Sequence, residues 1–137
     1  MVIGSQSGNV QLAAGTSRAG FAAGGVESLR ILRGVVRADG RTVPDNPVGY
    51  KVTKPRDTTG IYDIEFTTPF PGVPGASVTQ VFNSGQDAYG PNPTLGGDTK
   101  DNAVIIFLLA QKMRVKTGDG GGGWSNSDFS FIVIGPR

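Results

Sequence analysis

The segment at positions 60–74, GIYDIEFTTPFPGVP, constrains the fold of this chain most strongly. Apolar side chains occupy every second position of its first half, at Tyr62, Ile64 and Phe66. The alternate positions carry Ile61 and the acids Asp63 and Glu65. Alternation with a period of two puts an apolar row and a mostly acidic row on opposite faces, as in a half-buried antiparallel strand. The segment therefore predicts a strand with its aromatic row in a core.

The second half of this segment predicts a change of sheet. Phe70 lies between two prolines, and Pro74 precedes another alternating run at residues 76–83, which contains Val78 and Phe82. A strand, a turn bounded by prolines and a second strand are typical of the corner of a β-sandwich or barrel.

Short strands account for the rest of the pattern. The seven expected strands cover residues 29–37, 50–54, 60–66, 76–83, 104–109, 112–117 and 129–134. The chain has 22 Gly and 9 Pro, which favours short strands and turns, and no segment has a helical period. We therefore expect an all-β fold, an antiparallel, jelly-roll-like β-sandwich of at least seven strands, formed by residues 29–137 as one domain.

Two of these strands predict contact with a partner chain. Residues 104–109, VIIFLL, are apolar on both faces, which indicates a central strand or a strand at a subunit interface. Residues 29–37 have no wholly polar face either. The long loop at residues 84–102 is of the kind that is functional or contacts a partner.

Residues 1–28 form an expected N-terminal arm that is rich in Gly, Ala and Ser. Such a segment has few side chains to bury and needs contacts from elsewhere to become ordered. Its candidate anchors are Val10, Leu12 and Phe21. Two explanations remain open: the arm binds a neighbouring subunit, or it lies along its own domain as an extra edge strand.

The composition excludes several classes of site. With no Cys there are no disulfides, and with no His there is neither a Ser-His-Asp triad nor the commonest metal ligand. The net charge of +2, with few aromatic residues among the basic ones, does not favour nucleic-acid binding. The N-terminus lacks the pattern of a signal peptide, and the apolar run at 104–110 is too short for a membrane-spanning helix. We therefore expect a soluble protein without a membrane segment.

Two motifs have a structural and a chemical interpretation. The run GDGGGG at residues 118–123 resembles a phosphate-binding loop, but no helix pattern follows it, and a hairpin loop is favoured. The groups Asp98, Asp101 and Asn102, or Asp39, Asp45 and Asn46, offer oxygen ligands for calcium without the spacing of an EF-hand. Turns closed by their own side chains explain them better, so neither a metal nor a cofactor is expected.

The charged strands also allow two interpretations. Asp63 and Glu65 share a face and have the residue types of a glycoside-hydrolase pair, but a solvated or salt-bridged face is favoured. Lys112, Arg114 and Lys116 alternate along another strand as a basic stripe. The stripe suits phosphate, sialic acid or nucleic acid, but no aromatic residue alternates within it. Protection of the strand from edge pairing is therefore favoured.

Two aromatic residues lie in long Gly-rich loops, where we expect them to be exposed: Tyr89 and Trp124. Exposed aromatic rings stack on sugars or insert into pockets of a partner protein. Tyr89, Trp124 and the basic stripe are therefore the candidate contacts with a surface or a glycan.

Several motifs resemble the C-terminal β-sandwich module of phage and bacterial fibre-like and collagen-like proteins, which is similar in layout to H-type lectin and C1q-like domains. The motifs are RILRGVVRADG at residues 30–40, GYKVTKPRDTTGIYDIEFTTPFPGVP at 49–74, MRVKTGD at 113–119 and DFSFIVIGPR at 128–137. The resemblance covers residues 29–137 and implies a trimeric, non-enzymatic module used for assembly or for gripping a surface. The usual binding-site residues of H-type lectins are not recognisable in this chain.

The residues and the resemblance together favour a structural protein of a bacteriophage virion or a similar surface assembly. It would be a capsid decoration protein or the tip of a short tail fibre, a homotrimer anchored by its arm to other subunits. The alternative is a lectin-like adhesion module that binds cell-surface glycans. An enzyme using Asp63 and Glu65 is a third and less favoured class.

Overall fold

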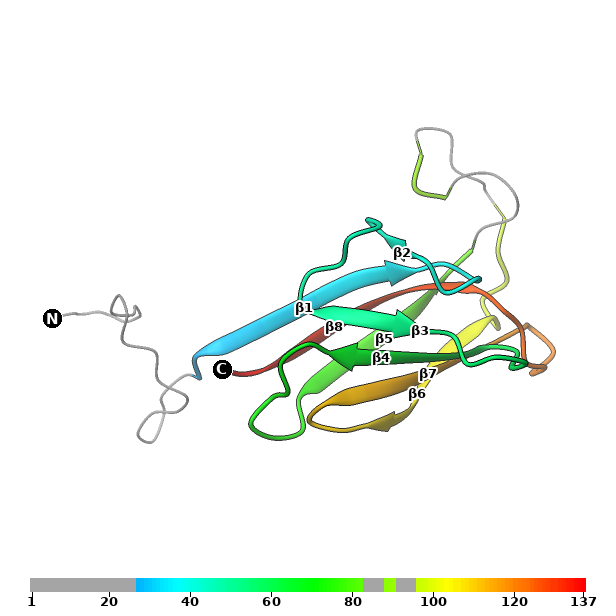
Figure 1. Cartoon of the computed structure of the whole chain (residues 1–137). Coiled ribbons are helices and arrows are strands. Elements are labelled where there is room, and N and C mark those ends of the chain that lie inside the picture. Colours follow the sequence, from blue (N-terminus) through cyan, green and yellow to red (C-terminus); the bar gives the residue numbers. More distant parts are fainter. Residues whose placement is uncertain (1–26, 83–87, 91–95) are drawn as a thin grey trace, which may run out of the picture.

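The computed structural model describes residues 27–82, 88–90 and 96–137 (Figure 1). The chain forms β1 (Leu29–Val36), β2 (Thr42–Val43), β3 (Tyr50–Thr53), β4 (Ile61–Phe66), β5 (Gly75–Val81), β6 (Asn102–Leu108), β7 (Lys112–Gly118) and β8 (Asp128–Pro136). No helix occurs in these ranges. In particular, no described segment makes a helix that is long and apolar enough to cross a bilayer.

The eight strands form two four-stranded antiparallel sheets, which confirms the predicted β-sandwich (Figure 1). Sheet 1 has the order β2-β1-β8-β5, and sheet 2 has the order β3-β4-β7-β6. The first long strand and the last strand are neighbours, with Leu29 opposite Pro136. The Arg137 N–H donates to the Ser28 carbonyl at 3.0 Å. The arm therefore joins the sandwich beside the C-terminus.

The core lies between the two sheets and contains the predicted aromatic row of β4. Tyr62, Ile64 and Phe66 are all buried. Phe129 and Phe131 of β8 face them from sheet 1 and are also buried. The ring of Tyr62 packs edge-on against Phe129, with ring centroids 5.1 Å apart. Alternation of apolar residues therefore identified the inner face of both strands correctly.

The connection between β4 and β5 is the predicted corner, because it leads from sheet 2 to sheet 1. Phe70 in the middle of this connection is 3% exposed and packs edge-on against Phe66, at 5.3 Å between ring centroids. The Arg30 guanidinium covers the Phe70 ring at 3.9 Å from its centroid. A Cβ atom at Gly135 would lie only 2.6 Å from Phe70 Cδ1, so a glycine is needed where the corner meets β8.

Two details of the predicted layout are wrong, and a third prediction is narrowed to one of its alternatives. The apolar strand at residues 104–109 was expected to be central or to lie at a subunit interface. It is not central, because β6 is the edge strand of sheet 2 and begins at Asn102, and the subunit interface stays a prediction. Residues 118–123 do not connect a hairpin, because β7 and β8 belong to different sheets; the loop closes a local turn through a bridge from Gly118 to Trp124. The short edge strand β2 lies in a segment predicted to be a loop.

The connections gather at the two ends of the sandwich. The "loop end" carries residues 37–41, 54–60, the part of 82–101 that is described, and 119–127. Ser28, the corner at 67–74, the turn at 109–111 and Arg137 lie at the opposite "terminal end". The predicted anchors Val10, Leu12 and Phe21 lie outside the described residues.

Candidate functional site

The basic stripe lies on the outer face of sheet 2. The predicted protection from edge pairing is wrong, because β7 lies between β4 and β6 and is not an edge strand. Met113, Val115 and Thr117 of β7 point into the core, and this pleat turns the alternate side chains, Lys112, Arg114 and Lys116, outward. The strand pairing puts Asp63 opposite Arg114 and Glu65 opposite Lys112. Acids and cations therefore form neighbouring rows on one surface.

The two acids of β4 are engaged in ion pairs, as predicted for a salt-bridged face. Arg114 donates from Nε and Nη2 to the two carboxylate oxygens of Asp63, at 2.6 and 2.8 Å. These hydrogen bonds lower the pKa of Asp63 below its usual value, although partial burial acts in the opposite direction. Glu65 pairs with Lys51 at 3.2 Å. The arrangement keeps Asp63 ionised, which is unsuitable for a general acid.

Aromatic rings do lie against the basic stripe, although none alternates within it. Phe107 of the neighbouring strand β6 lies beneath two of the cations, with Lys112 Nζ at 5.8 Å and Arg114 Cζ at 5.4 Å from its centroid. Trp124 lies beneath the third, with Lys116 Nζ 3.8 Å from the ring centroid. A one-strand pattern could not reveal these contacts, because they arise across the sheet and from the loop after β7.

The prediction of two exposed aromatic residues is right for Trp124 and wrong for Tyr89. Trp124 is 62% exposed. Tyr89 is half-buried, and its hydroxyl donates to Asp128 Oδ2 at 2.7 Å, while the Arg37 guanidinium lies 5.0 Å from its ring centroid. The buried Asp128 also accepts the Ala38 N–H at 2.8 Å through Oδ1. Tyr89 thus ties its loop to the sandwich.

One aspartate of each acidic group closes a turn, as the sequence predicted. Asp98 Oδ1 accepts the Lys100 N–H at 2.9 Å, and Asp39 Oδ1 accepts the Arg41 N–H at 3.0 Å. The described residues contain no group of three or more acidic, His or Cys side chains that could hold a metal ion.

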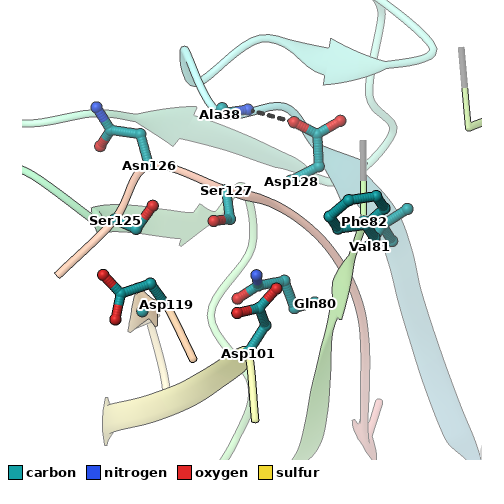
Figure 2. Close-up of a pocket in the computed structure, with 11 residues that line it drawn as sticks. Ala38, Gln80, Val81, Phe82, Asp101, Asp119, Ser125, Asn126, Ser127 and Asp128 are labelled. Atoms are coloured by element: carbon teal, nitrogen blue, oxygen red, sulfur yellow. Dashed lines mark hydrogen bonds between the residues drawn. The ribbon is translucent and has the colours of Figure 1, made fainter. Parts of the chain in front are cut away.

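A cleft of about 210 Å³ opens at the loop end between the ends of β5, β6 and β8 (Figure 2). Asp101, Asp119 and Asp128 line it together with Gln80. The Gln80 Oε1 atom is buried and has no hydrogen-bond partner among the described residues. The cleft is thus polar and suits ordered water.

The glycine-rich run uses its amides internally. Asp119 Oδ1 accepts the N–H groups of Gly121 and Gly123, at 2.9 and 2.7 Å. Gly122 has a φ of 86°, a backbone conformation that favours glycine. A phosphate-binding loop needs free amides directed at the anion. This geometry is that of a local turn and not of a phosphate-binding loop.

The outer face of sheet 1 differs from that of sheet 2 in carrying exposed isoleucines and only a few charged side chains. Ile31 of β1 is 58% exposed, and Ile132 of β8 is 43% exposed. Between the strands lies a shallow groove of about 430 Å³. Its walls combine the apolar residues Val35, Val43 and Ile132 with the polar residues Arg33, Ser77, Thr79 and Ser130. We call Ile31, Val35, Val43 and Ile132 the "sheet 1 patch". The sequence indicated it only by the lack of a polar face in β1.

A second apolar surface follows β6. Val104, Ile106 and Leu109 are exposed by 40%, 47% and 40%, and we call the last two, Ile106 and Leu109, the "β6 edge patch". A break in the pairing register between Ile105 and Phe107 inserts Ile106 as an extra residue. Such a bulge re-aims side chains at a sheet edge. The two apolar faces seen in the sequence thus belong to an edge strand with one row in the core and one row exposed.

Comparison of the chain with protein-family models, with curated proteins and with solved structures finds no match.

Proposed function

We propose that this protein is a non-enzymatic structural subunit that associates as a homotrimer. It would serve in a phage virion or a similar surface assembly, as a capsid decoration protein or the tip of a short fibre. The observation that carries the proposal is the presence of two separate exposed apolar surfaces, the sheet 1 patch and the β6 edge patch. The assignment to a virion depends on the resemblance of the motifs in residues 30–137 to fibre-like modules.

The presence of two different apolar patches on one subunit supports association into a closed ring of subunits. A two-fold dimer uses one self-complementary patch, whereas a ring uses two different patches, each contacting the other on the next subunit. The sheet 1 patch and the β6 edge patch are carried by different sheets. Contiguous exposed apolar surface is unfavourable in water and marks sites of association. Packing one patch against the other would cover both in every subunit.

The chemistry of the acids supports a role without catalysis. A retaining or inverting glycosidase needs one carboxyl group that stays protonated near neutral pH. Asp63 instead has a lowered pKa because it accepts two hydrogen bonds from Arg114. Glu65 is paired with Lys51 and is exposed.

The oligomeric state in solution tests the proposal. Light scattering of the full-length protein at high micromolar concentration should give the mass of three chains. A chain that remains monomeric under these conditions would show that the apolar patches do not support self-association.

The N-terminal arm, residues 1–28, is the proposed attachment to the larger assembly. Because residues 29–137 contain every strand of both sheets, deletion of the arm should leave the sandwich folded. The same deletion should abolish co-sedimentation with the parent particle. An arm-deleted protein that still co-sediments would place the attachment on the sandwich itself.

A further inference from the structure

The most unusual surface that self-association does not explain lies at the loop end of sheet 2. A hollow of about 270 Å³ there is bounded by Trp124, Lys116 and Lys100, with Val104 and Asn102 on β6. We define these five residues as the "Trp124 pocket". Its walls combine an aromatic ring, two cations, an apolar side chain and an amide. That combination differs from both the apolar sheet 1 patch and the paired charges around Asp63.

Strand register brings these groups together. Val104 lies directly opposite Lys116, and Asn102 lies opposite Gly118, so Asn102 and Val104 share the outer face with Lys116. The bridge from Gly118 to Trp124 then folds the indole back over the end of β7. Lys100, Asn102 and Val104 come from one segment, and Lys116 and Trp124 come from another. Only the strand pairing brings the two segments together, which explains why the sequence pattern did not reveal the pocket.

The indole is both exposed and held in place. Trp124 is 62% exposed, while the ammonium of Lys116 lies 3.8 Å from the ring centroid. This cation–π contact orients the ring before any ligand arrives. A binding group that is already oriented loses less freedom on binding. The exposed part of the ring is an apolar platform of the kind that packs on the C–H face of a sugar.

The cations of the pocket are available for an anion. Neither Lys116 nor Lys100 has a carboxylate partner within the described residues. Asp119 also lines the hollow, but its Oδ1 atom already accepts two backbone N–H groups of the glycine turn. The Lys116 ammonium lies over the indole ring, so a ligand can bind this cation through a carboxylate and pack an apolar ring face on the part of the indole that stays exposed.

We infer that the Trp124 pocket binds a saccharide that carries a carboxylate, of the uronic or sialic acid class. The sugar ring packs on the indole and on Val104, the carboxylate binds Lys116 and Lys100, and the Asn102 amide is in position for a hydroxyl group. The volume is slightly below the range of about 300–1,000 Å³ for pockets that hold drug-sized molecules, which suits one or two sugar rings. The pocket lies within one chain, so the inference does not depend on the proposed trimer.

The single Trp of the chain makes a direct test simple, because its fluorescence reports only on this pocket. The full-length protein is titrated with trigalacturonate and with sialyllactose, up to about 10 mM to include weak binding. Lactose and sodium phosphate serve as the neutral-sugar and simple-anion controls. We expect a saturable change in emission with at least one of the two acidic saccharides, and none with lactose or phosphate.

Variants distinguish a specific site from general attraction. Loss of a hydrogen bond to a charged group costs about 1.5–3 kcal/mol, so Lys116→Gln should weaken binding about tenfold or more. Lys51→Gln removes the same charge elsewhere on the outer face of sheet 2 and should leave binding unchanged. Trp124→Ala should abolish binding. Calorimetry measures this variant, because it has no Trp fluorescence.

Three results would overturn the inference. The first is that neither acidic saccharide gives a saturable change in emission. The second is that lactose or phosphate binds as well as the acidic saccharide. The third is that Lys116→Gln and Lys51→Gln lose the same amount of affinity. Light scattering of the same samples reports the oligomeric state separately. A monomer that binds the acidic saccharide would therefore refute the proposed trimer and support the pocket, and a trimer that does not bind would do the reverse.

Discussion

The two outer faces of the sandwich are built on the same pleat and the same core but have opposite character. On sheet 1, the outward positions of β1, β5 and β8 carry Ile31, Ile132 and small hydroxyl side chains, with Arg33 as the charged residue. On sheet 2, the outward positions carry two acids and four cations. These are Lys51, Asp63, Glu65, Lys112, Arg114 and Lys116.

This contrast indicates which face is adapted to water. The charges of sheet 2 are arranged in opposite-sign pairs across neighbouring strands, which stabilises a sheet and keeps the surface solvated. The sheet 1 patch has no such rows and leaves apolar side chains exposed. In the proposed homotrimer, sheet 1 and the edge of β6 would form the interface, and the remaining face of sheet 2 would stay open to solvent and ligand.

The largest expected effect comes from the core that both faces share. Phe66 is 3% exposed and packs against Phe70, so Phe66→Ala should lower the free energy of unfolding by about 3–5 kcal/mol. Denaturant unfolding at a fixed protein concentration measures the change. A loss below about 1 kcal/mol would show that the sheets do not rely on this contact, and that the inner faces are assigned wrongly.

The next effect separates the two outer faces. Ile132→Lys places a charge in the middle of the sheet 1 patch, where burial in an interface is costly, and should weaken the trimer by at least about tenfold. Thr53→Lys adds the same charge to the exposed surface of β3 in sheet 2 and is the matched control. Light scattering over a dilution series measures both variants.

The results for Ile132→Lys and Thr53→Lys decide which outer face forms the interface. Dissociation of Ile132→Lys alone, with an unchanged circular dichroism spectrum, would locate the interface on sheet 1. If both variants remain trimeric, the sheet 1 patch is not part of the interface.

The sequence predicted the inner faces much better than the outer ones, for a physical reason. Burial of the Tyr62, Ile64 and Phe66 row is imposed by the pleat of one strand, so a single alternating run is sufficient to identify it. The outer contacts arise between strands that are distant in sequence. The pairing of Asp63 with Arg114 and the stacking of Lys116 on Trp124 depend on register and on a loop, neither of which one strand encodes.

The position of β6 was left open for the same reason. An apolar strand has the same sequence pattern whether a neighbouring strand or a partner chain covers it. Only the strand order shows that residues 104–109 lie at the edge of sheet 2. Tyr89 is a further example, because its partner Asp128 lies 39 residues away and shares no motif with it.

A smaller effect concerns the ion pairs of sheet 2 and their dependence on pH. The pKa of Asp63 is lowered in the folded protein, chiefly by its hydrogen bonds from Arg114. Its contribution to stability is therefore present above the unfolded pKa of about 3.9, and is lost as the pH falls through the folded value. Asp63→Asn should cost about 1 kcal/mol at neutral pH and less near pH 2.

Urea unfolding of the wild type and Asp63→Asn at both pH values measures this difference. Glu65→Gln is the control, because the Lys51–Glu65 pair is more exposed and should contribute less. Identical acid dependence in the wild type and Asp63→Asn would mean that the bidentate pair does not form in solution.

The smallest effect tests whether the cations of sheet 2 take part in assembly at all. Lys112 and Lys116 have no acidic partner within the described residues, whereas Arg114 holds Asp63. The double variant Lys112→Gln, Lys116→Gln therefore removes the unpaired charges without disturbing the ion pair. We expect a change in unfolding free energy within about 0.5 kcal/mol, an unchanged trimer, and co-sedimentation with the parent particle that depends only weakly on salt. If this variant dissociates or fails to co-sediment while Ile132→Lys does not, association is electrostatic and the roles of the two faces are reversed.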